Sequence, residues 1–166
     1  MPHTRRRSYE TGHRPKFLVV VDGTTECERA ARFAARRVAR TGAILTMLTV
    51  IKPPDAFEWL GVGDVMQAEA EADAARVLEN AAGRARNAAG VEPEQFTRIG
   101  DVEEEILKFI EEDADVSYLV LAAATGKEGP GPLVSNVAGK AASTYPVPVI
   151  IVPGGLSDDE IDAIAG

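Results

Sequence analysis

The fold of this chain is decided by residues 118–152, which begin with the apolar run Tyr118-Leu-Val-Leu-Ala122 and end with Val147-Pro-Val-Ile-Ile-Val152. Between them lie the glycine- and proline-rich segment Ala123-Ala-Thr-Gly-Lys-Glu-Gly-Pro-Gly-Pro132 and a stretch of small residues. A short apolar run bounded by turn residues is typical of a strand buried on both faces. A helix is expected over 136–145, because Pro146 disfavours helix at the residue before it. The stretch therefore predicts a strand, a loop, a crossover helix and a second, parallel strand.

The same alternation extends back to the N-terminus. Strands are predicted at 17–21, 43–51, 95–99, 118–122 and 147–152. Helices are predicted at 25–41, at 64–89, from Gly100-Asp101 onward and at 136–145. Thr25 and Glu28 are expected to form a capping box at the first helix. Five strands that alternate with helices indicate the α/β class and an open, doubly wound parallel sheet with right-handed crossovers.

One interval, 55–63, is predicted as an irregular loop. Its large apolar residues are Phe57, Trp59 and Leu60. Ligands of open parallel sheets bind at the carboxyl ends of the strands, where this loop begins. The three side chains either form a lid over such a cleft or pack beneath the loop, and the sequence leaves both alternatives open.

The length, charge and hydropathy of the chain limit the functions that it can have. At 166 residues, 45% of them hydrophobic, the chain is long enough for one domain with a substantial core. The net charge of −8 is uneven, because residues 1–15 form a basic arm, predicted to be flexible, and the remainder is acidic. An acidic body repels nucleic-acid phosphates and anionic membranes, so neither is an expected partner. No apolar run approaches the roughly 20 residues of a spanning helix, and a soluble cytoplasmic protein is predicted.

Residues that carry nucleophilic or metal chemistry are scarce. Cys27 is the one cysteine, which excludes an internal disulfide and a cysteine metal cluster. We interpret its thiol as packed or idle, the alternative being a redox centre favoured by the helix start. Both histidines, His3 and His13, lie in the arm, so a Ser/His/Asp set and a histidine metal site are not expected in the folded body. We predict no catalytic residues and no metal site.

Two surface features each leave an alternative open. Arginines recur at spacings of three and four along the first helix, at Arg29, Arg32, Arg36 and Arg40. We interpret the stripe as a solvated face paired with glutamates, the alternative being a dock for an acidic partner. Near the C-terminus a short amphipathic turn follows Ser157, with Ile161 and Ile164 on one side. These isoleucines need a covering surface, which is either the chain's own sheet edge or that of a second subunit.

Six short motifs occur in order: Val-Val-Val-Asp22-Gly23, Leu48-Thr49-Val50, Gly100-Asp-Val-Glu-Glu-Glu-Ile106, Ala114-Asp115, Leu119-Val-Leu121 and Pro-Val-Pro-Val-Ile-Ile-Val152. Together they resemble the universal stress protein family over residues 16–164. The loop Thr-Gly-Lys-Glu-Gly-Pro-Gly-Pro-Leu-Val-Ser135 is similar to that of a bacterial single-domain subgroup. The resemblance implies a Rossmann-like fold of the adenine nucleotide alpha hydrolase-like type, with strand order 3-2-1-4-5. It also implies a family domain over 16–154, a C-terminal tail over 155–166, and a homodimer through the last strand, Val147 to Val152.

One branch of this family binds ATP through the motif Gly-x2-Gly-x9-Gly-Ser/Thr after strand four, and another branch lacks it. A literal match, Gly126-x2-Gly129-x9-Gly139, would leave too few residues for a crossover helix before Pro146. Counting from the flanking strands instead places the motif on Ala122, Thr125, Ser135 and Asn136, with a helix cap at Ser135. Every position then departs from the pattern, and the added side chains hinder close approach of a phosphate to the backbone.

The altered loop has two interpretations. In one, Gly126 keeps the loop deformable, Lys127 pairs with a phosphate, and Ser135 and Asn136 leave free amides at a helix start. In the other, Ser135 simply caps its helix and Lys127 is solvated. Pro130 and Pro132, which lack amide donors, and the negative charge of Glu128 favour the second.

In nucleotide-binding relatives, the positions that match Asp22 and Val50 meet the adenine and ribose, and the resemblance implies the same role here. The alternative for Asp22 is a local turn into the first helix. The implied function is that of a non-catalytic universal stress protein, a stress-response or ligand-sensing module. Its expected ligand is ATP or AMP, bound weakly and not required, at Asp22, Val50, Ala122, Thr125, Gly126, Lys127, Ser135 and Asn136.

Two other functions are weighed against this one. The first is a pure dimeric protein-interaction module with no nucleotide, which the prolines and the missing glycines of the loop favour over an enzyme. The second is a slow ATPase on the same fold. The sequence offers neither a convincing general base nor an intact phosphate loop for such an enzyme.

Overall fold

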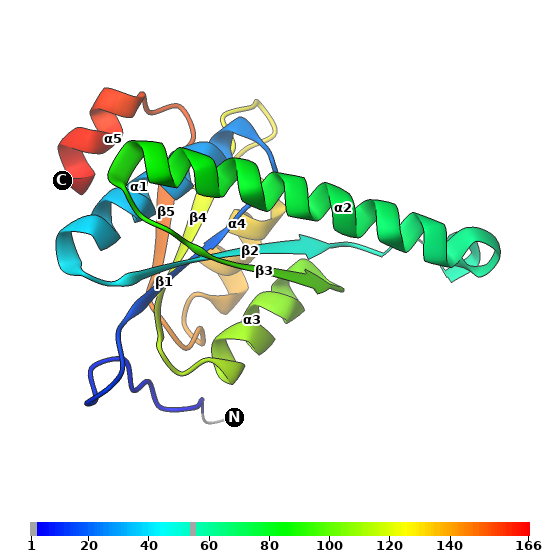
Figure 1. Cartoon of the computed structure of the whole chain (residues 1–166), viewed down its shortest axis with the longest axis horizontal. Helices are drawn as coiled ribbons and strands as arrows, with labels where there is room; N and C mark the ends of the chain where they lie inside the picture. The colour runs from blue at the N-terminus through cyan, green and yellow to red at the C-terminus, as the bar shows by residue number, and fades with distance from the viewer. Residues whose placement is uncertain (1–2, 54–55) are drawn as a thin grey trace.

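The structure of the chain, a computed structural model, describes residues 3–53 and 56–166, with side chains at these positions except 56–62, 140 and 141. Five parallel strands form one sheet in the order β3-β2-β1-β4-β5 (Figure 1). They are β1 (Lys16–Val20), β2 (Ile44–Ile51), β3 (Glu94–Ile99), β4 (Val116–Ala123) and β5 (Val149–Pro153). The predicted α/β class, parallel sheet and strand order are confirmed.

Helices cover both faces of this sheet. They are α1 (Thr25–Thr41), α2 (Ala56–Ala89), α3 (Val102–Glu112), α4 (Pro132–Asn136) with the π-helical turn η1 (Val137–Ala141), and α5 (Asp158–Ala165). Figure 1 shows α1 and α2 on one side of the sheet and α3 on the other. Along β1, Val19 packs into the layer under α1, whereas Leu18 packs with Ile106 of α3, because neighbouring side chains of a strand point to opposite faces. Both faces of β1 are therefore buried.

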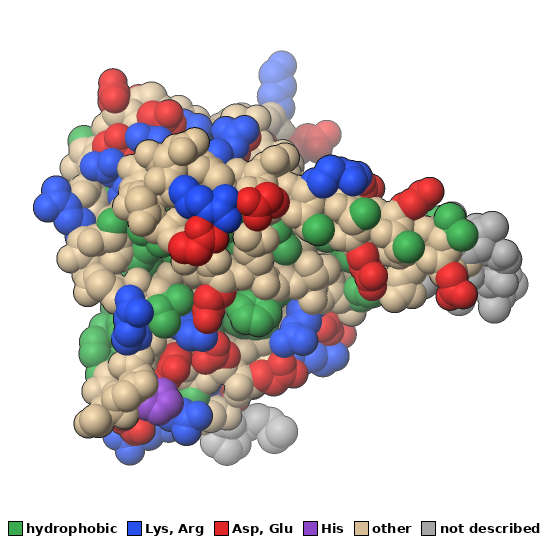
Figure 2. Space-filling view, viewed as in Figure 1, with side chains coloured by type: hydrophobic (Ala, Val, Ile, Leu, Met, Phe, Trp, Pro, Cys, Tyr) green, Lys and Arg blue, Asp and Glu red, His purple; other side chains and the backbone are tan. Residues whose placement is uncertain are grey.

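The predicted irregular loop at 55–63 is wrong for its described residues, because α2 already begins at Ala56. Gly61 and Gly63 suggest a loop, but a glycine within a helix costs only about 1 kcal/mol relative to alanine. The alanine- and glutamate-rich sequence that follows favours helix and outweighs that cost. The start of α2 projects well beyond the sheet (Figure 1), and Figure 2 shows hydrophobic and acidic side chains scattered along this projection. The side chains of Phe57, Trp59 and Leu60 lie outside the described residues, so the two alternatives for them remain predictions.

The basic segment that precedes β1 lies against the end of the sheet opposite the strand carboxyl ends. The Arg7 amide donates to the Ala114 carbonyl at 3.0 Å, and the Arg6 guanidinium donates to the Ile110 carbonyl at 2.7 Å. Arginine is well placed there, because the carbonyls at the end of α3 carry a partial negative charge. His13 Nδ1 lies 2.9 Å from a carboxylate oxygen of Asp115. The side chains of Arg6 and His13 in the predicted arm are thus bonded to acceptors of the chain's own body.

The arginine stripe of α1 is covered by α5. Arg32 makes two bonds to the Asp162 carboxylate, at 2.8 and 2.7 Å, and Arg36 Nε lies 3.2 Å from it. Arg29 pairs with Asp158. The hydrogen bond from Arg32 lowers the pKa of Asp162 below its usual value. The stripe therefore docks an acidic segment, as one alternative held, but that segment belongs to the same chain.

The two C-terminal isoleucines differ in how far their side chains are buried. The Ile161 side chain is fully buried, whereas Ile164 is 61% exposed. The open alternative about the covering surface is resolved for Ile161, because α5 lies on its own subunit beside α1. An apolar anchor on one side and ion pairs on the other fix α5 in place.

We expect Ile161→Ala to destabilise the fold by about 2–5 kcal/mol, because it removes a fully buried side chain and leaves a cavity. Urea unfolding followed by circular dichroism measures this change. Ile164→Ala is the matched control in the same helix, and its effect should stay within about 0.5 kcal/mol. Equal effects of the two substitutions would contradict the packing of α5 described above.

Candidate functional site

A cleft of about 570 Å3 lies at the carboxyl ends of β1, β2 and β4. The chain passes from β1 to β2 and β3 on one side and places β4 and β5 on the other, so the cleft lies at the point where the strand order reverses. Open α/β sheets bind ligands at such a switch point. The volume is within the range of small-molecule pockets.

Apolar side chains from the strand ends and from α4 form one part of the lining: Val20, Val21, Val50, Val102, Leu121, Ala122, Leu133 and Val134. Polar and charged side chains form another part: Asp22, Thr24, Glu26, Lys52, Asp101, Glu103 and Asn136. An apolar surface with a few convergent polar groups is the usual composition of a site that holds an aromatic ring and orients it by hydrogen bonds.

Asp22 follows directly after β1 and lies in the turn that leads into α1. Its carboxylate accepts hydrogen bonds from the Thr24 amide at 2.9 Å and the Thr24 hydroxyl at 2.6 Å. Burial alone would raise its pKa, but hydrogen bonds from Cys27 and Thr24 outweigh burial and lower the pKa. Asp22 is therefore an anion that lines the cleft and also shapes the turn, as the alternative interpretation held.

The same turn sets the start of α1. The cap residue is Thr24, not Thr25 as predicted, because Thr24 Oγ1 accepts from the Cys27 amide and the bonds to Asp22 hold Thr24 in the extended conformation that a cap requires. Gly23 has a φ of 85°, which its lack of a side chain permits. The capping box of Thr25 and Glu28 does not form.

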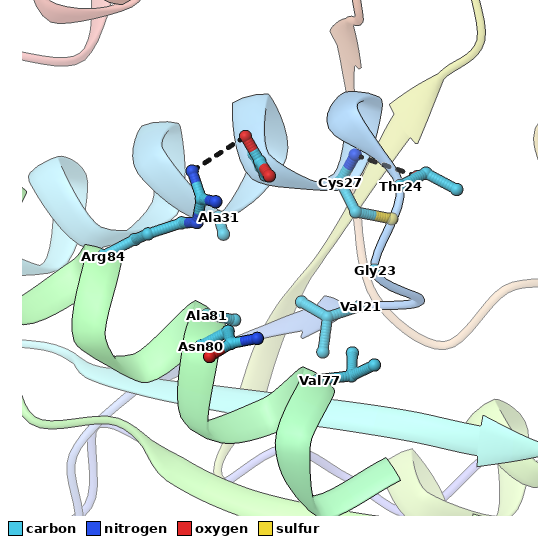
Figure 3. Close-up of a pocket in the computed structure, with 10 residues that line it drawn as sticks. Val21, Gly23, Thr24, Cys27, Ala31, Val77, Asn80, Ala81 and Arg84 are labelled. Atoms are coloured by element: carbon cyan, nitrogen blue, oxygen red, sulfur yellow. Dashed lines mark hydrogen bonds and ion pairs between the residues drawn. The ribbon is translucent and has the colours of Figure 1, made fainter. Parts of the chain in front are cut away.

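Cys27 lies in the first turn of α1, and Figure 3 shows its side chain beside Gly23 and Val21. The thiol donates to the Val20 carbonyl at 3.4 Å. Burial, with the neighbouring Asp22 carboxylate, raises the pKa of the thiol to about 12. The group is thus a neutral thiol near pH 7, which agrees with a packed rather than a redox-active cysteine.

A second, smaller cavity of about 210 Å3 lies between α1 and α2 (Figure 3). Val21, Val77 and Ala81 line its apolar side, and Arg84 is paired with Glu28 at 2.9 Å at its edge. Cys27 borders both cavities. Most polar groups of the larger cleft come from the ends of β1 and β2 and from the starts of α1 and α3, and that cleft is the stronger candidate.

The helix that follows the glycine-rich segment begins earlier than predicted. α4 begins at Pro132, with Gly131 as its cap at a φ of 98°. Ser135 is inside the helix, and its amide donates to the Gly131 carbonyl at 3.0 Å. The predicted cap at Ser135 is wrong because proline suits the first helical position, where its fixed φ is helical and its missing donor is not needed. The Gly131-Pro132 pair was the sequence signal for this start.

The structure brings together half of the predicted site residues. Asp22, Val50, Ala122 and Asn136 line the cleft. Thr125, Gly126 and Lys127 lie in an exposed loop and Ser135 on an exposed part of α4, and none of the four is among the described lining residues.

Sequence reasoning missed four charged residues of the cleft, namely Glu26, Lys52, Asp101 and Glu103. Asp101 and Glu103 lie at the start of α3, which the sequence predicted from Gly100-Asp101 onward, and Asp101 caps it by accepting from the Glu104 amide at 3.1 Å. Lys52 follows the end of β2, two residues beyond Val50, and that spacing on a strand indicates the same face.

A family model, the universal stress protein family, matches residues 13–153 of the chain. Three similar solved structures are universal stress protein UspA from Lactobacillus plantarum, a universal stress protein in complex with cAMP, and a universal stress protein family protein from Arabidopsis thaliana with AMP bound. Their sequence identities to this chain are 20%, 19% and 17%, and their TM-scores are 0.66, 0.61 and 0.58, respectively. The matches cover 83%, 85% and 84% of this chain and 97%, 98% and 91% of those chains. At such identities the structures show the shared fold.

No curated protein sequence gives a significant match. In the part of the chain that the structure describes, no helix is long and apolar enough to cross a membrane. The family model spans most of the chain, and the motifs from Asp22 to Val152 that carry the resemblance fall within the matched region. The chain belongs to the universal stress protein family.

Proposed function

We propose that the protein is a non-catalytic stress-response module that senses an adenine nucleotide by binding it in the cleft at the ends of β1, β2 and β4. The observation that carries the proposal is the cleft itself, which combines an apolar surface, the Asp22 carboxylate and the position at the switch point. The structures of relatives with cAMP and with AMP support it.

In this proposal the adenine and ribose lie between the ends of β1 and β2, at Asp22 and Val50. The Asp22 carboxylate accepts hydrogen bonds from the ligand. The remainder of the ligand extends along Ala122 and Asn136 toward the loop that contains Thr125, Gly126 and Lys127 and toward Ser135. Asp22, Val50, Ala122 and Asn136 line the same cavity, which supports the proposal that they contact one ligand.

Sensing without turnover fits the side chains of the cleft. The Cys27 thiol, with its pKa raised to about 12, is protonated and is a poor nucleophile. Two further polar pairs of the cleft are held by local bonds, Asp22 with Thr24 and Asn136 with Glu103. A general base needs a free position beside the bond that is broken.

We further propose that two copies pair through β5. This strand is at one edge of the sheet, with β4 on its inner side. Edge strands present unpaired backbone groups that favour pairing with another strand. Ile151 is 38% exposed on β5, so an apolar side chain is available at the proposed contact.

Asp22→Asn should weaken AMP binding about tenfold, because an amide oxygen is a weaker acceptor than a carboxylate while the shape is kept. Isothermal titration calorimetry with AMP measures the affinity. Asp158→Asn, which changes a carboxylate of α5 outside the lining of the cleft, is the control and should bind as the unchanged protein does. Undetectable AMP binding by the unchanged protein would instead favour the interaction module without nucleotide.

Ile151→Asp should convert a dimer to a monomer, because it places a charge on the exposed apolar side chain of β5. Analytical ultracentrifugation measures the mass in solution. Val65→Asp, at a 63% exposed position on α2, is the control. Dissociation by Val65→Asp alone would place the contact on α2 and argue against β5.

A further inference from the structure

The charges of the cleft are unsuited to a polyphosphate. Four carboxylates, those of Asp22, Glu26, Asp101 and Glu103, line it, and Lys52 is the one cation among its described lining residues. The carboxylates come from the end of β1, the first turn of α1 and the start of α3, so they surround the cavity from more than one element. Like charges in a partly enclosed site repel more strongly than they do in bulk water.

Several hydrogen-bond donors at the phosphate end of the cleft are already bonded within the chain. Asn136 Nδ2 donates to Glu103 Oε1 at 2.6 Å. In the adjoining loop, the Ala124 amide donates to the Pro130 carbonyl and the Gly129 amide to the Gly126 carbonyl, both at 3.1 Å. Each bond uses a donor that a phosphate-binding loop would direct at its ligand.

Backbone chemistry removes further donors. Pro130 and Pro132 have no amide hydrogen. The Ser135 amide is bonded to Gly131, and α4 continues as a regular α-helix for only five residues before η1. Lys127, the cation of the loop, is exposed and is not among the described lining residues. Among the described lining residues, Lys52 is therefore the one cationic side chain that offsets the four carboxylates.

The apolar part of the lining, in contrast to the phosphate end, is suited to a ligand. Val20, Val50, Leu121 and Leu133 present a surface on which a purine ring can pack. Asp22 and Asp101 supply acceptors for hydroxyl and amino groups, which are donors of a nucleoside. These features suit an uncharged base and sugar.

We infer that the cleft is selective for adenine nucleosides and their monophosphates, and that each added phosphate weakens binding, so that adenosine binds more tightly than ATP. This inference rests on the proposed function, because it concerns the ligand class of the same cleft. It makes the protein a sensor of dephosphorylated adenine compounds. A bound divalent cation would reduce the discrimination, because it screens phosphate from the carboxylates.

The test is calorimetric titration of the full chain with adenosine, AMP and ATP, first without magnesium and at low ionic strength. The expected order of affinity is adenosine, then AMP, then ATP, with ATP at least tenfold weaker than adenosine. The difference should shrink at 1 M salt, where charges are screened within about 3 Å. ATP affinity equal to or above that of adenosine would overturn the inference while leaving the proposed function intact. Absence of binding by all three ligands would overturn both.

A double substitution tests the cause. Glu26→Gln with Glu103→Gln keeps side-chain size and leaves an amide oxygen to accept from Asn136, but removes two negative charges. It should raise ATP affinity at least tenfold and change adenosine affinity by a much smaller factor, because adenosine carries no charge. Glu104→Gln is the matched control, because Glu104 is in the same turn of α3, is exposed and is not among the described lining residues. Unchanged ATP affinity in the double variant, or an equal gain in the control, would refute the electrostatic selection.

Discussion

The structure depends on the double burial of β1. This strand pairs with β2 on one side and β4 on the other, and its alternate side chains enter separate apolar layers under α1 and α3. A strand held in this way has a fixed carboxyl end, because a shift of one residue would exchange the side chains packed under α1 with those packed under α3 and disrupt both layers. Asp22 and Gly23 follow that end, so the position of the cleft is set by the packing of Val19 and Leu18 below it.

The turn after β1 links this constraint to the chemistry of the cleft. Asp22 holds Thr24, Thr24 caps α1, and Cys27 bonds back to the Val20 carbonyl. The carboxylate that lines the cleft therefore also positions a helix, and together with burial it raises the pKa of the neighbouring thiol. A residue with both a structural and a ligand-facing role explains why the two interpretations of Asp22 are compatible.

Charged side chains are paired on the surface of α1 and at the N-terminal segment, but they are not balanced at the cleft. Over α1, the acidic residues of α5 neutralise the arginine stripe, and the basic segment before β1 is met by acceptors at the end of α3. At the cleft, by contrast, four carboxylates face one lysine among the described lining residues. The negative charge of the body is thus left unbalanced where a ligand would bind, and that imbalance is what a charged ligand encounters there.

The sequence by itself determined the α/β class, the parallel sheet and the place of Asp22 at the end of the first strand, because a buried strand of five or six apolar residues has one stable environment in a sheet. The site role of Val50 came from the family resemblance. The order of the strands and the family came from the resemblance carried by short motifs. The start of α4 was also a local signal, because Gly131 and Pro132 prevailed over the capping preference of Ser135. Tertiary structure decided that α5 covers the arginines of its own chain and that Glu26, Asp101 and Glu103 meet at one cavity. These residues are far apart in the chain, and their distances follow from how helices pack on the sheet, which local sequence does not encode.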